Sequence, residues 1–271
     1  MKEPIEVYRQ PDLENASLIV GWQNSSGNLG SKVVEYLSRH LQARTFGEIE
    51  PVQFFPLNGV EVENNIAKMP FSRFSSGDRK DLVIFESEPP SFDKYRFLKS
   101  VLDTGEYYCK IKDLYTIDGI VSPISHTSPR RLWAVYSDGD FQKRLRDYEL
   151  ENITWEGPPT LSSFLLWLAQ NRGIPGLSLW PEISFYLSAT EDPKAVKSVL
   201  SFFNRRFDLG LDFGDLDSQI KTQNGNLALL RKENPEIDDY ISTLEVGLSL
   251  NEDDQLKLAQ GVTEFLEKML V

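Results

Sequence analysis

The sequence predicts an α/β protein with three layers, in which a largely parallel mixed sheet has helices on both faces, followed by a helical C-terminal region. Three observations predict this fold class. An apolar run at residues 17–22 leads through a glycine-containing loop into an amphipathic segment, which is typical of a strand–loop–helix unit. Apolar runs and amphipathic segments then alternate as far as residue 207. Beyond residue 208, strand signals disappear.

The first strand–loop–helix unit organises the prediction. Residues 17–22 form a short, continuously apolar run, as expected of a strand that is buried on both faces. The segment after the loop has apolar residues at three- and four-residue spacings, which share one helix face: Leu29, Val33, Val34, Leu37 and Leu41. The loop between them follows the carboxyl end of the strand, where open sheets usually hold their ligands.

The other elements of the α/β part follow in order. Apolar runs, mostly bounded by proline or glycine, predict a short edge strand at 5–8 and further strands at 52–57, 81–86, 114–121, 131–136 and 177–180. Asn-Gly and Ser-Ser-Gly sequences predict hairpins or a long loop over 58–79. Helical periodicity predicts helices over 92–102, after Asp138, over 161–168 where Pro158-Pro159-Thr160 opens the helix, and over 193–207 after an Asp192 cap.

The C-terminal part has a different character. Helices are expected over 216–232, 235–244 and 252–270, so we place a domain boundary near residue 210: an α/β domain over 1–210 and a helical region over 211–271. This helical region is acidic, with 13 Asp and Glu against 5 Lys and Arg from residue 212 onward. The acidic residues indicate either solvated helix faces or a docking surface for a basic partner.

Composition excludes several classes of function. The net charge of −12 disfavours non-specific binding to nucleic acid or to an anionic membrane, because both require a basic surface. No apolar run approaches the roughly 20 residues that cross a bilayer. The only cysteine, Cys109, cannot form an internal disulfide and is expected in the core. We therefore expect a soluble cytoplasmic protein that has neither a nucleic-acid nor a membrane partner.

The loop after the first strand is the first candidate ligand site. It sits at a helix start, where free N–H groups and the helix dipole favour an anion. Its spacing differs from a P-loop, because Ser31 precedes Lys32, and the dinucleotide fingerprint is also absent. The alternative is that the glycines serve the turn and the polar residues cap the helix. The candidate residues are Gln23, Asn24, Ser25, Gly27, Asn28 and Gly30.

Four later residues complete the candidate ligand-binding set. His126 and Arg130 lie in a polar loop after a strand, where a histidine acts as a base or an anion clamp, or holds the backbone by hydrogen bonds. Glu156 and Trp180 lie where we expect strand ends, and Trp22, Trp155 and Trp180 either line a cleft there or pack in the core. We identify no catalytic residue, no metal site and no cofactor, because neither a nucleophile elbow nor clustered His and Cys residues occur.

Several segments, read in order, resemble the proteasome assembly chaperone family, second-chaperone type. The match spans roughly residues 15–205 and is closest in style to longer bacterial members that add a helical C-terminal region. The segment from Ser125 to Arg130 is similar to a His-Thr-Arg-Pro-like segment of that family. The four segments are Val20-Gly21-Trp22 with Gly27-Asn28-Leu29-Gly30, Ser125-His126-Thr127-Ser128-Pro129-Arg130, Glu156-Gly157-Pro158, and Gly173-Ile174-Pro175 before Ser178-Leu179-Trp180.

The resemblance implies a phosphorylase-like α/β fold, a homo-oligomer (a trimer is favoured) and, by analogy with eukaryotic and archaeal relatives, a role in proteasome assembly. The chain departs from one feature of the family. Archaeal relatives that dock on proteasomes can end in a hydrophobic–Tyr–any tail, whereas this sequence ends Met269-Leu270-Val271.

Two functional hypotheses follow. The first is a non-catalytic oligomeric scaffold or assembly-chaperone-like protein that binds a protein partner. It rests on the resemblance, the acidic helical region and the missing catalytic set. The second is a small-molecule binding protein or enzyme that acts on a nucleotide or another phosphorylated compound at the carboxyl edge of the sheet. We favour the first, because glycines and single histidines have simple structural explanations.

Overall fold

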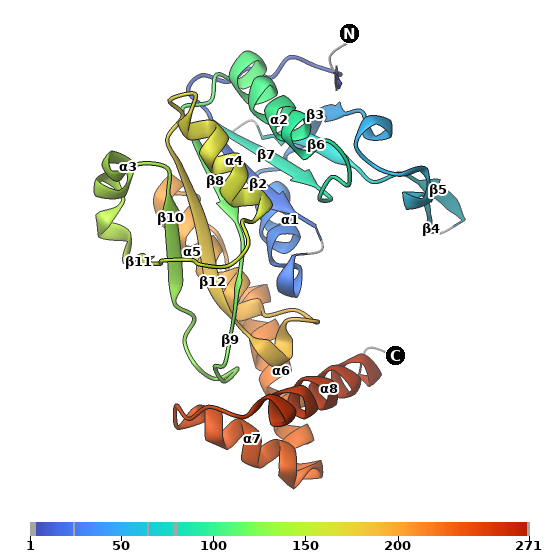
Figure 1. The fold of residues 1–271 in the computed structure, drawn as a ribbon, viewed down its shortest axis with the longest axis vertical. Helices are drawn as coiled ribbons and strands as arrows, with labels where there is room; N and C mark the ends of the chain where they lie inside the picture. Colours follow the sequence, from blue (N-terminus) through green and yellow to red (C-terminus); the bar gives the residue numbers. More distant parts are fainter. Residues whose placement is uncertain (1–3, 24, 64, 78–80, 270–271) are drawn as a thin grey trace. The chain divides into compact units, whose positions relative to one another are not determined.

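A computed structural model describes residues 4–23, 25–63, 65–77 and 81–269 (Figure 1). Asn24, Leu270 and Val271 lie outside this set, so part of the candidate loop and the tail are not described. The strands are β1 (Ile5–Val7), β2 (Ser17–Trp22), β3 (Arg44–Ile49), β4 (Glu61–Glu63), β5 (Ile66–Lys68), β6 (Ser72–Ser76), β7 (Leu82–Ser87), β8 (Asp113–Ile117), β9 (Ile120–Ser122), β10 (Leu132–Tyr136), β11 (Glu151–Asn152) and β12 (Gly176–Ser184).

The helices follow the predicted order. The α-helices are α1 (Leu29–His40), α2 (Lys94–Cys109), α3 (Gly139–Arg144), α4 (Leu161–Gln170), α5 (Pro193–Phe207), α6 (Gly214–Glu233), α7 (Pro235–Glu245) and α8 (Glu252–Lys268). Short 3-10 turns are η1 (Ser26–Asn28), η2 (Pro51–Gln53), η3 (Leu57–Gly59), η4 (Arg146–Tyr148) and η5 (Phe185–Leu187). In the part of the chain that is described, no helix combines the length and the apolar character needed to span a bilayer.

The main sheet is mixed and has ten strands, in the order β1-β3-β6-β7-β2-β8-β12-β10-β11, with β9 paired beside β12. Strand β2 pairs in parallel with β7 and with β8, and β12 pairs in parallel with β8 and with β9. The pairs β1–β3, β3–β6 and β6–β7 are antiparallel and form one edge of the sheet. The predicted fold class, a largely parallel mixed sheet with helices, is thereby confirmed, and so is the edge strand expected near residue 5.

The chain divides into two compact units. The first comprises residues 1–25, 30–118 and 134–179, and the second comprises residues 26–29, 119–133 and 180–271. The boundary expected near residue 210 falls inside the second unit, between α5 and α6. The division into an α/β domain over 1–210 and a helical region over 211–271 stays a prediction.

The first unit has helices on both faces of β2. The side chains of Leu18, Val20 and Trp22 share one hydrophobic cluster with residues of α2 and α4. Successive side chains of a strand point to opposite faces, so Gly21 faces the other way. There, a Cβ on Gly21 would lie 2.5 Å from Cγ1 of Val34, which belongs to α1. Helices α2 and α4 therefore cover one face of β2 and α1 covers the other.

The second unit has its own core beyond the sheet. Helices α6, α7 and α8 enclose a cluster that also takes in Tyr186 and Leu187 of η5. The buried helix residues are Leu227, Leu230, Ile237, Ile241, Leu244, Leu258 and Val262. Each of the three predicted helices is present, and Asn251 caps the last of them by accepting a hydrogen bond from the Asp254 N–H at 2.9 Å.

Two strand predictions are wrong in an informative way. Residues 52–57 form no strand; Pro51 instead begins the 3-10 turn η2, because its ring presets a turn conformation and removes a ladder donor. The neighbouring strand is β3, whose mixed sequence Arg-Thr-Phe-Gly-Glu-Ile gives only a weak apolar signal. The strand expected over 114–121 is divided into β8 and β9.

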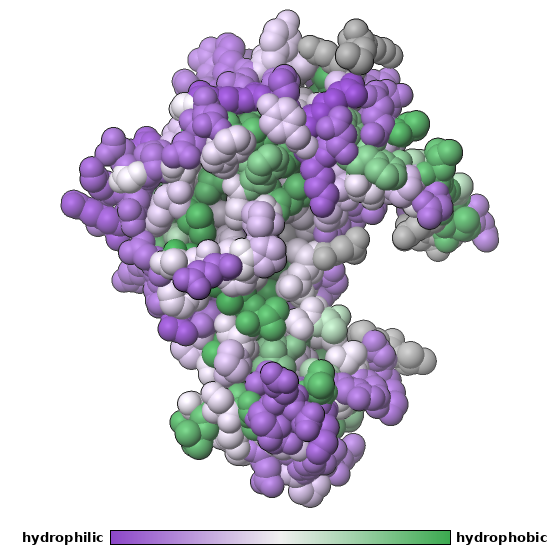
Figure 2. Space-filling view, viewed as in Figure 1, coloured by the Kyte–Doolittle hydropathy of each residue, from purple (hydrophilic) through white to green (hydrophobic). Residues whose placement is uncertain are grey.

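The segment expected to contain hairpins or a long loop holds one hairpin, formed by β4 and β5, and then the sheet strand β6. Figure 1 shows this hairpin extending away from the main sheet. Green, apolar side chains lie over it in Figure 2. Val62 and Ile66 are among its exposed residues.

Candidate functional site

The loop after β2 is held by its own polar groups. In the first unit, Gln23 Nε2 donates to Glu86 Oε1 at 3.2 Å, and Ser25 Oγ accepts a hydrogen bond from the Gly30 N–H at 3.1 Å. Ser25 thus satisfies an N–H group in the first turn of α1, as the capping alternative expects. Asn28, by contrast, is exposed and has a φ of 51°, a conformation that asparagine tolerates.

The two loop glycines are buried for different reasons. Gly27, in the second unit, has a φ of 63°, and its N–H donates to the Ser188 carbonyl at 2.8 Å. Gly30, in the first unit, lies so close to β2 that a Cβ would be 2.7 Å from the Trp22 carbonyl oxygen. These roles in the turn and in helix–strand packing support the structural interpretation of the glycines. Ligand binding by this loop stays a prediction.

His126 is buried in the second unit against Tyr186. The His126 N–H donates to the Tyr186 hydroxyl at 2.6 Å, and the same hydroxyl lies 2.8 Å from His126 Nδ1. The hydroxyl can both accept and donate, so the tautomer of the ring sets which of these two atoms donates the proton. Burial lowers the pKa of His126 to about 4, and the nearby Glu245 carboxylate opposes that shift only partly. At neutral pH the imidazole is therefore uncharged and engaged.

Arg130 forms a buried ion pair in the same unit. Its Nε and Nη2 atoms each lie 2.9 Å from Oδ2 of Asp192, and both side chains are almost fully buried. Nη1 donates to the carbonyls of Ser125 and Ser128 at 3.1 and 2.8 Å. The guanidinium therefore ties the loop between β9 and β10 to the start of α5.

Lys194 completes this network. Its ammonium donates to the carbonyls of His126 and Thr127 at 2.6 and 2.8 Å. Burial, followed by the nearby Arg130 charge, lowers the Lys194 pKa. Thus His126, Arg130 and Lys194 use their polar atoms to hold one loop. Such a network stabilises a conformation, and it contains no base directed at an activated nucleophile.

The remaining candidates are placed differently. Glu156 is exposed in the first unit, in the coil before α4. Trp180 is buried in the second unit, within β12. Trp22 is buried in the first unit and donates from Nε1 to Ser162 Oγ at 2.9 Å, whereas Trp155 is half exposed. Core packing is therefore confirmed for Trp22 and Trp180.

Sequence reasoning missed a titratable group at the carboxyl end of β8. Asp118 Oδ2 accepts a hydrogen bond from Thr160 Oγ1 at 2.8 Å, and Thr160 also caps α4 by accepting from the Ser163 N–H at 3.0 Å. Burial raises the Asp118 pKa to about 6, although hydrogen bonds from Thr160 and Ser162 oppose the shift. The sequence signal was an aspartate directly after a buried strand.

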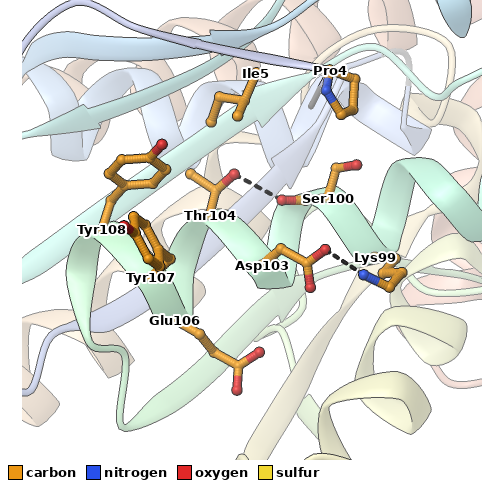
Figure 3. A pocket seen from close by; sticks show the side chains of 9 residues that line it. All are labelled: Pro4, Ile5, Lys99, Ser100, Asp103, Thr104, Glu106, Tyr107 and Tyr108. Carbon is orange, nitrogen blue, oxygen red and sulfur yellow. Dashed lines mark hydrogen bonds and ion pairs between the residues drawn. The ribbon is translucent and has the colours of Figure 1, made fainter. Parts of the chain in front are cut away.

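A surface groove of about 650 Å³, which the sequence did not predict, lies between α2 and the chain around β1 (Figure 3). It is lined by Pro4, Ile5, Lys99, Ser100, Asp103, Thr104, Glu106, Tyr107 and Tyr108. Its charges are largely paired: Asp103 binds Lys99 at 2.6 Å and Arg172 at 2.9 Å, and Arg172 also binds Glu106 at 2.5 Å. A neighbouring recess of about 130 Å³ also borders β1.

Within the described ranges, no three His, Cys, Asp or Glu side chains are grouped closely enough to hold a metal ion. Cys109 is buried, and burial raises its thiol pKa to about 12, so its sulfur is held as an unreactive thiol.

The chain matches the model of the PAC2 family over residues 18–228. Among solved structures, it resembles PbaB, an archaeal proteasome activator from Pyrococcus furiosus, at 25% identity and a TM-score of 0.71, over 86% of this chain and 99% of that one.

Two bacterial structures share the fold. One is the proteasome-assembly chaperone homologue Rv2125 of Mycobacterium tuberculosis, with 17% identity, a TM-score of 0.71 and coverage of 83% and 99%. The other is a PAC2 family protein of Streptomyces avermitilis, with 20% identity, a TM-score of 0.69 and the same coverage of 83% and 99%. No curated protein matches the chain. Because the family model covers well over half of its length, this chain belongs to the PAC2 family.

Proposed function

We propose that this protein is a non-catalytic, assembly-chaperone-like scaffold that forms a homo-oligomer, with a trimer favoured, and binds other proteins. Its partners in this proposal are proteasome subunits or the assembled core particle. The observation that carries the proposal is the PAC2 family match over residues 18–228, together with the likeness to an archaeal proteasome activator at 25% identity. A cytoplasmic location belongs to the same proposal.

The polar groups of the second unit support a non-catalytic role. A catalytic base must reach a proton on a bound substrate, and a nucleophile needs an adjacent base. His126 and Arg130 instead make hydrogen bonds and an ion pair within the protein. Their arrangement fits a rigid scaffold.

The acidic C-terminal helices support a protein partner of basic character. Helices α6 to α8 bury one apolar core, which leaves their acidic residues on the outer faces. Association between opposite charges is accelerated at low ionic strength and weakened by salt. We therefore propose that basic surfaces of partner proteins bind this region.

The proposal is tested with the full-length protein and purified proteasome α and β subunits from the same organism. Light scattering measures the oligomer, and native mass spectrometry measures complexes with subunits or core particles. We expect a defined homo-oligomer and a complex whose dissociation constant rises with salt. A control protein of similar size and net charge should form no complex. A monomer that binds neither subunits nor core particle would refute the proposal.

Binding of a phosphorylated compound by residues 23–30, His126, Arg130, Glu156 and Trp180 is the alternative, and it is not favoured. A thermal-shift series with nucleotides and inorganic phosphate tests it, because a ligand that binds only the folded state raises the melting temperature. Asn28→Ala, at an exposed position, should then reduce the shift. If no compound shifts the wild type, the alternative is eliminated.

A further inference from the structure

Strand β1 leaves one edge of the main sheet open. In the part of the chain that is described, β1 is the first strand in the order of the sheet and pairs with β3 alone. The Pro4 carbonyl and the Tyr8 N–H form hydrogen bonds of 2.7 and 2.8 Å with the chain around β3. Because backbone groups alternate in direction along a strand, those of Ile5 and Val7 point to the outer side. An open edge of this kind is a template for a further strand.

Two hollows border this edge strand. Figure 3 shows Pro4 and Ile5 across the groove of about 650 Å³ from the side chains of α2. The recess of about 130 Å³ is lined by the same two residues and by Glu6 and Glu48, which are register partners and point to the face opposite Ile5. A strand added beside β1 would direct its own side chains alternately to the two faces. The hollows therefore give room to both sets of side chains.

The recess is acidic. Its charged residues are Glu6, Glu48 and Glu50, and none of the described residues that line it is a lysine or an arginine. Glu6 lies directly opposite Glu48 in the ladder, and like charges in that arrangement destabilise a strand pair. The Tyr8 hydroxyl donates to Glu48 Oε2 at 3.1 Å, and burial followed by the Glu48 charge raises the Tyr8 pKa. A lysine or arginine side chain from a partner would relieve the repulsion between the carboxylates.

The cation that the sheet itself offers on this face is engaged in other contacts. Arg73 of β6 is the register partner of Glu48. Its Nε lies 3.5 Å from the Glu86 carboxylate, and its guanidinium lies over the Phe71 ring at 3.8 Å. The recess therefore keeps a net negative charge, which favours a basic occupant.

The groove on the α2 side has a different character. Its carboxylates are already paired with Lys99 and Arg172. The rings of Tyr107 and Tyr108 meet edge to face at 4.8 Å, and with Ile5 they contribute apolar surface to the lining. An apolar side chain suits this groove, because a charged one would have to compete with ion pairs that are already formed.

We propose that the outer edge of β1 binds an extended segment of a partner protein in which basic residues alternate with apolar ones. The segment adds a strand to the sheet through the outward backbone groups of Ile5 and Val7. Its lysine or arginine side chains enter the acidic recess, and its apolar side chains enter the groove. Main-chain hydrogen bonds give affinity in this binding mode, and side-chain pockets give specificity. This inference goes beyond the proposed function, since it needs neither the homo-oligomer nor a proteasome partner.

The test measures binding of fluorescent peptides to the full-length protein by anisotropy. The probe is the peptide Val-Lys-Val-Lys-Val-Lys with blocked ends. One control peptide, Val-Val-Val-Lys-Lys-Lys, has the same charge and composition without the alternation. A second control is the alternating peptide with every backbone nitrogen methylated, which cannot donate to a strand edge. We expect the probe to bind about tenfold more tightly than either control, because only the probe can form the edge hydrogen bonds with both sets of side chains in place.

Two variants of the protein address the edge and the charge separately. Val7→Pro removes an outward N–H, and proline is tolerated on an edge strand where the N–H would face solvent. Glu6→Gln combined with Glu50→Gln removes two carboxylates and leaves the hydrogen bond to Glu48 in place. We expect the dissociation constant of the probe to rise about tenfold in Val7→Pro and about fivefold in the double variant.

The matched control is Asp140→Asn combined with Asp147→Asn. It removes the same charge from side chains that are 87% and 81% exposed, on α3 and η4 of the same unit. These elements precede β11, which ends the sheet order on the side opposite β1. The dissociation constant of the probe should therefore stay unchanged in this control.

The outcomes decide the inference independently of the proposed function. Binding of the probe that weakens in both edge variants and persists in the control supports the inference. Equal binding of the block peptide, or full binding to Val7→Pro, would show attraction by net charge alone and overturns it. A wild type that does not bind the probe at millimolar concentration also overturns it, and the oligomer and proteasome-complex measurements still decide the proposed function. Circular dichroism checks the fold of each variant, and if Val7→Pro misfolds, the methylated peptide decides whether the backbone edge is used.

Discussion

Arg130 and Asp192 bring two opposite charges into the interior of the second unit, where their side chains are 1% and 2% exposed. A buried charge loses its favourable hydration free energy. The attraction between the two charges, together with further hydrogen bonds to each side chain, must offset that loss. Arg130 meets this condition through two backbone carbonyls, and Asp192 through the Ala195 N–H at 3.1 Å. Removing one partner should therefore lower the free energy of unfolding by much more than the intact pair contributes to it.

Asp192→Asn tests the cost of removing one partner of this buried ion pair. The variant keeps an oxygen that can accept from the Ala195 N–H but leaves the Arg130 charge buried without a counter-ion. We expect the free energy of unfolding to fall by about 3–5 kcal/mol, measured by urea denaturation. The control is Asp140→Asn, because Asp140 pairs with Lys143 at an exposed site and should change stability by at most about 1 kcal/mol. Equal effects of the two variants would contradict the prediction.

His126 and Asp118 should give stability opposite dependences on pH. Burial lowers the His126 pKa to about 4 from its ordinary 6.5, so between these values the unfolded chain binds more protons and stability rises with pH. Burial raises the Asp118 pKa to about 6 from 3.8, so between these values the folded chain binds more protons and stability falls with pH. The two contributions oppose each other between about pH 4 and pH 6.

Single variants should reveal each contribution. The wild type should lose up to about 3 kcal/mol relative to His126→Gln as pH falls from 6.5 to 4. Relative to Asp118→Asn, it should instead lose a similar amount as pH rises from 4 to 6.5. The free energy of unfolding of the wild type and of each variant is measured at several pH values. Subtracting the variant's value from that of the wild type cancels the contributions of all other titratable groups. A difference that does not change with pH would show that the native pKa of that residue is unperturbed.

At the scale of elements, the contact of α1 with β2 depends on two glycines. A Cβ at Gly21 would lie 2.5 Å from Cγ1 of Val34, and a Cβ at Gly30 would lie 2.7 Å from the Trp22 carbonyl oxygen. Real Cβ atoms do not approach so closely, so the helix would have to move away from the strand. This close approach explains the glycine positions without any ligand.

Gly30→Ala should therefore destabilise the protein. Overpacking against backbone costs about 1–3 kcal/mol, which thermal or urea denaturation can measure. Gly139→Ala serves as the control, because nothing lies within 4 Å of the added Cβ at the start of α3. Its stability should stay the same or rise slightly. If Gly30→Ala behaved like this control, the packing explanation would fail.

Local patterns predicted most helices and buried strands. The cap at Asp192 lies where the sequence placed it, because capping depends on neighbours within three residues. Thr160 and Asn251 likewise cap helices that the sequence predicts. Strand β3 was missed and residues 52–57 were misassigned. A strand with a mixed polar and apolar sequence is recognised by its partners, here β1 and β6, which are remote in sequence.

At the scale of the whole molecule, the second unit is assembled from three separate segments. Tyr186 and Leu187, which come before α5, are buried in the core formed by α6, α7 and α8. A protein that ends at the predicted boundary, residue 210, lacks these three helices, so the side chains of Tyr186 and Leu187 would become exposed to solvent.

The shortened protein, residues 1–210, should be less stable and should expose apolar surface. We expect a lower melting temperature and increased binding of the dye ANS compared with the full chain. A cut at residue 250, which removes α8 alone, should give an intermediate effect, since α8 contributes Leu258 and Val262 to the same core. Unchanged stability of residues 1–210 would instead support an independent boundary at that point.

Part of the candidate site was also foreseeable. The loop after β2, the polar loop around His126 and the buried tryptophans were all identified as positions where polar or aromatic groups meet strand ends. The partners of these groups were not foreseeable, because Tyr186 and Asp192 lie about sixty residues from His126 and Arg130 along the chain. Such pairs form only when distant segments fold together.

Local sequence patterns are enough to predict the fold class, the order of most elements and the acidic character of the C-terminal helices. These follow from periodicity and composition, which act over a few residues. The packing of distant segments sets which strands are antiparallel, namely β1, β3 and β6, and it holds His126 and Arg130 in the interior. These depend on long-range pairing and burial, which no local pattern records.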